Sequence, residues 1–252
     1  MQKQIRLRSA GRSAGPERGL SMASKSKKVI LFIAEGPTDE DTLSPILKKI
    51  FQNDEVRFHI VHGDMTSNWS VSVNSAVKTV YEHIEMERKR YGFQKSDIQK
   101  VIHLVDTDGV FIPDDRIIYH KGKDIQYYDD RVEAPFPQRV LDRNQRKSQI
   151  LSRLSETGKV GTLPYRVYYF SRNLEHVFHN RTGNLTDAEK IDFADDFADR
   201  YLSDPEGFLA FLSDSDFTVS GDYDDTWKFI AQGVNSLHRH SNFHLLFESS
   251  PS

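Results

Sequence analysis

Four carboxylates in two short segments have the residue types and spacing needed for chemistry. Glu35 and Asp39 bound the segment EGPTD, and Asp106 and Asp108 lie in the segment DTDG. Clustered carboxylates repel one another, and a hard divalent cation relieves that repulsion while binding their oxygens. Mg²⁺ retains water and open positions for a substrate phosphate, so this set favours metal-assisted phosphoryl transfer. Because the chain has no cysteine, a metal must be held by oxygen or imidazole.

Each acidic segment directly follows an apolar run that is predicted to be a buried strand. The runs are 29–34 (VILFIA) and 101–105 (VIHLV), which are typical of strands covered on both faces of a parallel sheet. In open parallel sheets, ligands bind at the carboxyl ends of the strands. We therefore expect the two acidic segments to meet there. If the strand geometry continues, Asp106 and Asp108 project to the same side.

The remaining elements complete a parallel α/β sheet flanked by helices. We predict strands at 56–61 and 166–170, a helix after the first strand that is capped by Thr38 or Asp39, and a long helix at about 70–91. Strand–helix–strand–helix–strand order predicts right-handed crossovers. Further helices are predicted at 173–180, 187–202, 205–213 and 224–238.

Composition divides the chain into three parts. Residues 1–27 are rich in Arg, Ser and Gly, and are interpreted as a disordered basic tail or as a misassigned extension upstream of Met22. Residues 28–180 contain the predicted strands and both acidic segments, with a polar insertion of a loop and a helix at about 110–160. Residues 181–252 form a helical C-terminal region. No apolar run approaches the roughly 18 residues of a membrane span, so no membrane partner is expected.

The two motifs, in this order and after the first and third strands, resemble those of the Toprim fold. This fold is the catalytic domain of topoisomerases, bacterial primases and a group of nucleases. The resemblance covers about residues 28–180 and implies Mg²⁺-dependent chemistry at a phosphodiester, with Mn²⁺ as an alternative ion. It implies an acid/base and metal-binding role for Glu35, catalytic metal ligation by Asp106 and Asp108, and a metal-binding role for Asp39.

Within this family the chain looks most like the small standalone nucleases of bacterial anti-phage systems. These resemble the overcoming-lysogenization-defect nucleases of abortive infection and often act with a separate ATPase. The resemblance implies a cytoplasmic nuclease for DNA or RNA, tRNA included, with a partner ATPase and a homodimer as an option. Another acid commonly follows the next strand in such proteins, and Glu175 holds that place here as a fifth metal ligand. The sequence fits equally well with Glu175 as an ordinary acidic residue at the start of a helix.

Several features leave alternatives open. The basic run Arg139, Arg143, Arg146, Lys147 and Arg153 has near-helical spacing, and could contact a nucleic-acid backbone or form a solvated face. Tyr127 and Tyr128 could stack on bases or pack internally. His103 is expected in the core. His176 and His179 are three residues apart and could face the site, but a helix surface is the expected position for both.

Two other functions also fit the sequence. One is a non-catalytic regulatory or binding subunit of an ATPase complex. The other is a Mg²⁺-dependent phosphatase, although an aspartyl-nucleophile phosphatase would carry its DxD motif after the first strand rather than the third. The acidic body of the chain, with its net charge of −3 despite the basic tail, argues against a general nucleic-acid coat protein. The acidic charge does not argue against a metal-dependent nuclease, because its metal ions bring positive charge to the phosphate.

Overall fold

The central element is a sheet of five strands, four of which run parallel. The computed structural model describes residues 28–60, 65–183, 185–214 and 216–248. The strand order is β2-β1-β3-β8-β7, and only the β7–β8 pair is antiparallel. The bounds are β1 (Val29–Ala34), β2 (Glu55–Ile60), β3 (Ile98–Asp106), β7 (Lys159–Val160) and β8 (Leu163–Phe170). The predicted parallel α/β sheet is confirmed.

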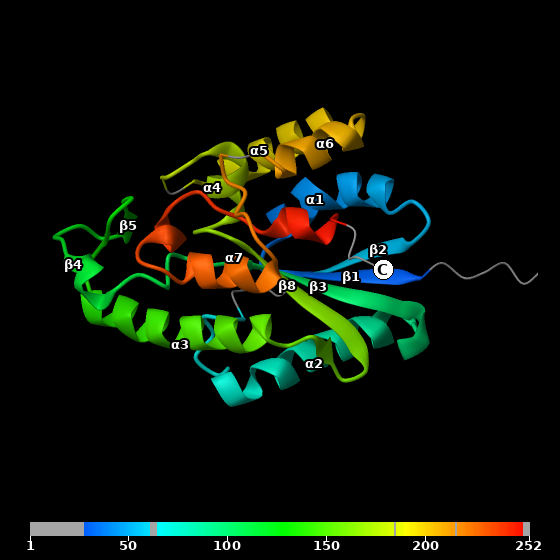
Figure 1. Ribbon diagram of the computed structural model, residues 1–252, viewed down its shortest axis with the longest axis horizontal. Helices are drawn as coiled ribbons and strands as arrows, with labels where there is room; N and C mark the ends of the chain where they lie inside the picture. Colours follow the sequence, from blue (N-terminus) through cyan, green and yellow to red (C-terminus); the bar gives the residue numbers. More distant parts are fainter. Residues whose placement is uncertain (1–27, 61–64, 184, 215, 249–252) are drawn as a thin grey trace, which may run out of the picture.

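Helices cover both faces of this sheet (Figure 1). One face carries α1 (Pro37–Ile50), α4 (Leu174–His179), α5 (Asp187–Leu202) and α6 (Pro205–Leu212). The other carries α2 (Val73–Tyr91) and α3 (Pro137–Ser155), together with buried residues of α7 (Tyr223–Ile230). Short 3₁₀ helices lie at Lys95–Asp97, Asp114–Arg116, Asn235–Leu237 and Phe243–Leu246. In the described part of the chain, no helix is both long and apolar enough to cross a membrane.

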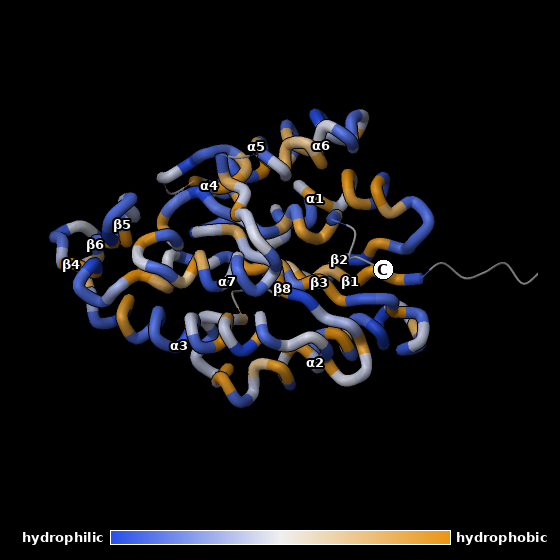
Figure 2. The backbone as a smooth tube through the Cα atoms, in the orientation of Figure 1, coloured by the Kyte–Doolittle hydropathy of each residue, from blue (hydrophilic) through white to orange (hydrophobic). Residues whose placement is uncertain are grey.

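The apolar run in β1 explains this layering. Side chains alternate across a strand, so Val29, Leu31 and Ile33 enter the core beneath α2 and α3. Ile30, Phe32 and Ala34 enter the core shared with α1 and the C-terminal helices. All six residues are therefore buried, which a strand with one solvated face would not permit. Figure 2 shows the hydrophobic residues gathered on these central strands.

The insertion is more ordered than the predicted loop and helix. Besides α3 it contains a second sheet of β4 (Ile117–Tyr119), β5 (Gln126–Tyr127) and β6 (Val132–Ala134), in the order β4-β6-β5. A separate small core lies beneath it, including Ile117 and Val132. The prediction missed these strands because two or three residues are too few to show an alternating pattern.

Two helix boundaries also differ from the prediction. The N-cap of α1 is Gly36, with Pro37 in the first helical position, rather than Thr38 or Asp39. Proline suits that position because its missing N–H has no partner there in any case. At the other end of the chain, α7 ends at Ile230 instead of 238, and Gly233 then adopts a φ of +53° that a continuing helix excludes.

Substitution of Phe32 by alanine is expected to destabilise the fold strongly. The Phe32 ring is fully buried and stacks on Phe58 with a centroid distance of 4.9 Å. Removing a buried Phe ring costs about 3–5 kcal/mol, through lost transfer energy and the cavity left behind. Urea unfolding of Phe32→Ala should show this loss, whereas Phe136→Ala, at a side chain that is 60% exposed, should change the free energy of unfolding little. Equal effects would contradict the assigned core.

Candidate metal centre

The ends of three neighbouring strands bring the predicted carboxylates together. Glu35 directly follows β1, and Asp106 is the last residue of β3, paired in register with Phe170 at the end of β8. Asp39 and Glu175 lie in the first turns of α1 and α4, the helices that follow β1 and β8. Asp106 interacts electrostatically with each of the other four acids, Glu35, Asp39, Asp108 and Glu175. All five predicted residues thus belong to one cluster, and their metal-binding role stays a prediction.

Burial and crowding change the acidity of two members of the cluster. Burial raises the pKa of Asp106 well above its ordinary value, and the four neighbouring carboxylates raise it further. Burial likewise raises the pKa of Asp39 to about 6, with a contribution from Glu175, although the Gly36 N–H opposes the shift by donating to Asp39 Oδ2 at 3.1 Å. Both groups therefore hold protons more tightly than free aspartates, mainly because they are buried and also because acidic neighbours lie close to them.

Two lysines partly neutralise the cluster from opposite sides. Lys147 of α3 is fully buried and donates from Nζ to Asp108 Oδ2 at 2.7 Å, and its Nζ lies 4.0 Å from Glu35 Oε1. Lys190 of α5 pairs with Glu175 Oε1 at 3.2 Å and keeps 34% of its side chain exposed. The amphipathic patterns of α3 and α5 do not identify Lys147 or Lys190 as partners of the carboxylates. These ion pairs depend on how each helix packs against the edge of the sheet.

The backbone turns sharply at Asp108, contrary to the expected continuation of the strand. β3 ends at Asp106, and Asp108 has a φ of +48°. Its N–H donates to the carbonyl of Arg172 at 3.0 Å, and Arg172 has a φ of +58° and donates its own N–H to Thr107 Oγ1 at 3.0 Å. Asp108 thus reaches the cluster through a left-handed turn, a conformation that Asp tolerates better than most residues.

The basic run on α3 faces inward over much of its length. Arg143 donates to the Asp108 carbonyl and to Tyr127 Oη, both at 3.2 Å. Arg146 donates to the Ser67 carbonyl and lies over the Trp69 ring at 4.5 Å. Lys147 is fully buried and is therefore not part of a solvated face. Arg143 and Arg146 make internal contacts but stay partly exposed, and their contact with nucleic acid stays a prediction. Arg139 and Arg153 are exposed.

The tyrosines and histidines singled out in the sequence also have structural contacts. Tyr127 lies beneath the Arg172 guanidinium at 4.8 Å, and Tyr128 beneath Arg131 at 4.1 Å, which favours packing over base stacking. His103 is a core residue, as predicted, with Nδ1 2.7 Å from Tyr165 Oη. His176 is buried rather than on a surface, and burial lowers its pKa to about 4.

The donor set fits a hard divalent ion, although the present contacts are made with lysine. Among the described residues, no three carboxylate or imidazole groups are arranged around a common point as a metal would need. Glu35, Asp108 and Glu175 instead face the two ammonium groups. The cluster has five carboxylates and two lysines, and the pKa of Asp106 is raised first by burial and then by the four neighbouring carboxylates. Oxygen ligands of this kind are those that Mg²⁺ and Mn²⁺ prefer.

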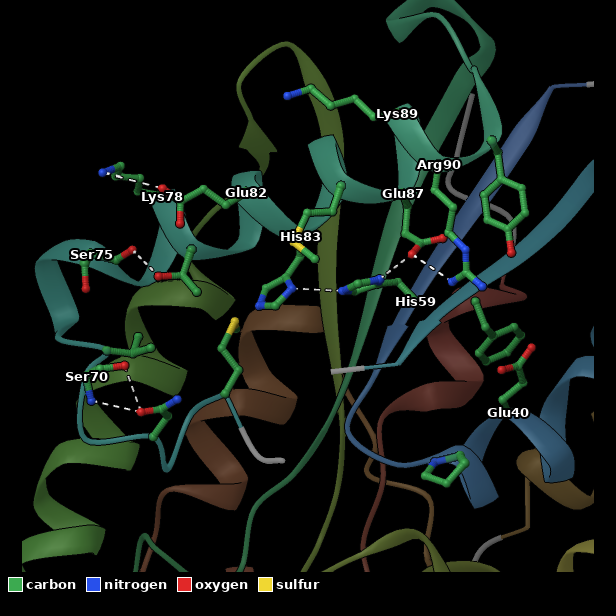
Figure 3. A pocket seen from close by; sticks show the side chains of 18 residues that line it. Glu40, His59, Ser70, Ser75, Lys78, Glu82, His83, Glu87, Lys89 and Arg90 are labelled. Carbon is green, nitrogen blue, oxygen red and sulfur yellow. Dashed lines mark hydrogen bonds and ion pairs between the residues drawn. The ribbon is translucent and has the colours of Figure 1, made fainter. Parts of the chain in front are cut away.

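A second polar site lies apart from the carboxylates, in a groove of about 1390 Å³ beside β2 and α2 (Figure 3). There His59 Nδ1 lies 2.8 Å from Glu87 Oε1, and His59 Nε2 lies 2.8 Å from His83 Nδ1. The groove includes Pro37 and Glu40 of α1 but none of the five clustered acids. Sequence reasoning missed this site because His59 lies on a different element, 24 residues before His83, although His83 and Glu87 are one turn apart on α2.

Comparison of the chain with protein-family models found no match, and comparisons with curated proteins and with solved structures found none either. The resemblance to Toprim proteins therefore depends on the two motifs and on their order along the sheet.

The free energy of unfolding of metal-free protein is expected to fall as pH rises from about 4 to about 6. The Asp39 pKa is raised from 3.8 to about 6, so the folded state binds more protons than the unfolded state in this interval. Denaturant titrations at several pH values in EDTA should show the slope, and Asp39→Asn should reduce it. An unchanged slope in Asp39→Asn would contradict the assignment.

Proposed function

We propose that this chain is a Mg²⁺-dependent nuclease that cleaves phosphodiester bonds in DNA or RNA. The observation that carries the proposal is the convergence of five carboxylates from three strand ends, with the pKa of Asp106 raised by burial and by the other four. Carboxylates in such numbers favour a metal-assisted reaction over one that relies on a single acid and base. The order of the two motifs favours nucleic acid as the substrate class.

The residues divide into roles according to their positions. Asp39 and Glu175 interact electrostatically with Asp106 and with each other, and these three would hold the ion. Glu35 and Asp108 lie beside Lys147. When bound, the ion supplies Lewis-acid stabilisation of charge that develops on the phosphate. Glu35, with 14% of its side chain exposed, is the group we assign to proton transfer, because it lies in the site and still reaches solvent.

The insertion supports a polymeric substrate over a small phosphate ester. It leaves two large aromatic side chains exposed, Tyr119 at 66% and Phe136 at 60%. The Arg139 guanidinium lies over the Phe136 ring at 4.7 Å, and Lys121 and Lys123 are exposed nearby in sequence. Exposed aromatics with adjacent cations suit stacking on bases and contact with a phosphate backbone. The insertion projects beyond the carboxyl edge of the central sheet (Figure 1). A nucleic-acid strand bound at the carboxylates would extend toward this insertion.

The assignments of a partner ATPase, a homodimer, a cytoplasmic location and a role in anti-phage defence form part of the same proposal. They are supported by the resemblance of the motifs and, for the cytoplasm, by the absence of cysteine.

Nuclease activity is expected to require divalent ions and Asp106. Purified chain, alone and with a candidate ATPase, is incubated with DNA, total RNA and a generic phosphate ester in Mg²⁺, Mn²⁺ or EDTA. Asp106→Asn should lower cleavage on the order of 100-fold, since weaker ion binding removes about 3 kcal/mol of transition-state stabilisation. Asp142→Asn, at an exposed position on α3, is the matched control and should retain full activity.

Three other outcomes separate the alternatives. Turnover of the phosphate ester without cutting of nucleic acid would favour a phosphatase. Tight ATPase binding with no cleavage in any condition would favour a regulatory subunit. Cleavage that persists in EDTA and in Asp106→Asn would refute the metal-dependent mechanism.

A further inference from the structure

We propose that the Lys147 ammonium is a resident cation of the carboxylate centre, and that it limits the centre to a single divalent ion. The inference rests on the proposed metal-dependent function and deepens it. Enzymes that transfer phosphoryl groups with two ions hold them about 3.5–4 Å apart between shared carboxylates. In this chain, a lysine supplies positive charge at one of those two places.

The contacts of Lys147 place its charge between two of the predicted ligands. Its Nζ lies 2.7 Å from Asp108 Oδ2 and 4.0 Å from Glu35 Oε1, and the side chain has no exposed surface. A divalent ion bound to both Asp108 Oδ2 and Glu35 Oε1 would take the place that the ammonium holds. The ammonium therefore competes directly with a second ion.

The helix that carries Lys147 also prevents it from moving aside. One turn earlier, Arg143 donates to the Asp108 carbonyl at 3.2 Å and to Asn144 Oδ1 at 2.9 Å, so α3 holds both the main chain and the side chain of Asp108. Ile150 and Leu151 of the same helix are fully buried. A lysine expelled from Asp108 would leave its charge buried without that partner, which is strongly unfavourable.

Lys190 provides the contrast within the same site. It is one-third exposed and pairs with Glu175 from α5, so its charged end can turn to solvent while its stem stays in place. Asp39 and Asp106 also lie within electrostatic range of Lys190. We therefore expect the single ion on this side of the centre, where the ammonium that it displaces has a route to water.

The test counts the Mn²⁺ ions bound per chain, by isothermal titration calorimetry and by electron paramagnetic resonance of free Mn²⁺. Wild-type protein should bind one ion. Lys147→Met should bind two, because Glu35 and Asp108 lose their resident cation. Lys190→Met removes the other lysine of the site and should still bind one ion, as should Arg153→Gln on the exposed side of α3.

Circular dichroism establishes whether each variant is folded, and Lys147→Gln, which can still donate to Asp108 without a charge, is the second variant if Lys147→Met does not fold. Two ions in the wild type, or one ion in a folded Lys147 variant, would overturn the inference and leave the nuclease proposal standing. If neither variant folds, the wild-type count decides, since one ion supports the inference and two refute it. Absence of Mn²⁺ binding, together with cleavage that EDTA does not affect, would overturn both proposals.

Discussion

Repulsion among carboxylates at one edge of a sheet is the interaction around which the rest of this structure is arranged. Two unit charges 4 Å apart interact by about 4 kcal/mol at an effective dielectric constant of 20. That energy is comparable with the whole stability of a small domain, about 5–15 kcal/mol. The surrounding structure offsets this repulsion with two lysines and with the Gly36 N–H that donates to Asp39. The raised pKa values of Asp39 and Asp106 also favour the neutral, protonated forms of these two carboxyl groups.

The sheet can hold this arrangement because both of its faces are covered. Side chains of β1 alternate between two hydrophobic cores. A shift of the strand by one residue would move every side chain into the opposite core, so the register is fixed. The C-terminal region contributes to the same packing, since Phe208 and Phe243 enter the core together with Phe32. A fixed register fixes where each strand ends, and so where Glu35, Asp106 and Glu175 lie.

The sequence was informative where a pattern is local and repeated. Continuous apolar runs identified β1 and β3, and the acids directly after them could be placed at the carboxyl edge without further information. The role of Glu175 could not be decided from the sequence, because an acid at a helix start and a metal ligand have the same local sequence. Its burial beside Lys190 depends on the packing of α4 against α5.

Lys147 could not be recognised from the sequence at all. It belongs to a basic run whose spacing fits a solvated helix, and only the docking of α3 beside Asp108 makes it a buried partner. The left-handed turn at Asp108 was hidden for a related reason, since it is set by hydrogen bonds to a loop 64 residues away in the chain. The strands of the insertion were missed because each is only two or three residues long.

The pairing of the loops after β3 and β8 has a consequence for how this protein can diverge. Thr107 donates to the Phe170 carbonyl, Arg172 donates to Thr107 Oγ1, and Asp108 donates to the Arg172 carbonyl, so the two loops leave the sheet as a matched pair. An insertion or deletion in either loop at this point would break the match and displace the Asp108 carboxylate. Length variation among homologues should therefore be concentrated after Gly109, in the segment that leads to β4, while these two loops keep their lengths.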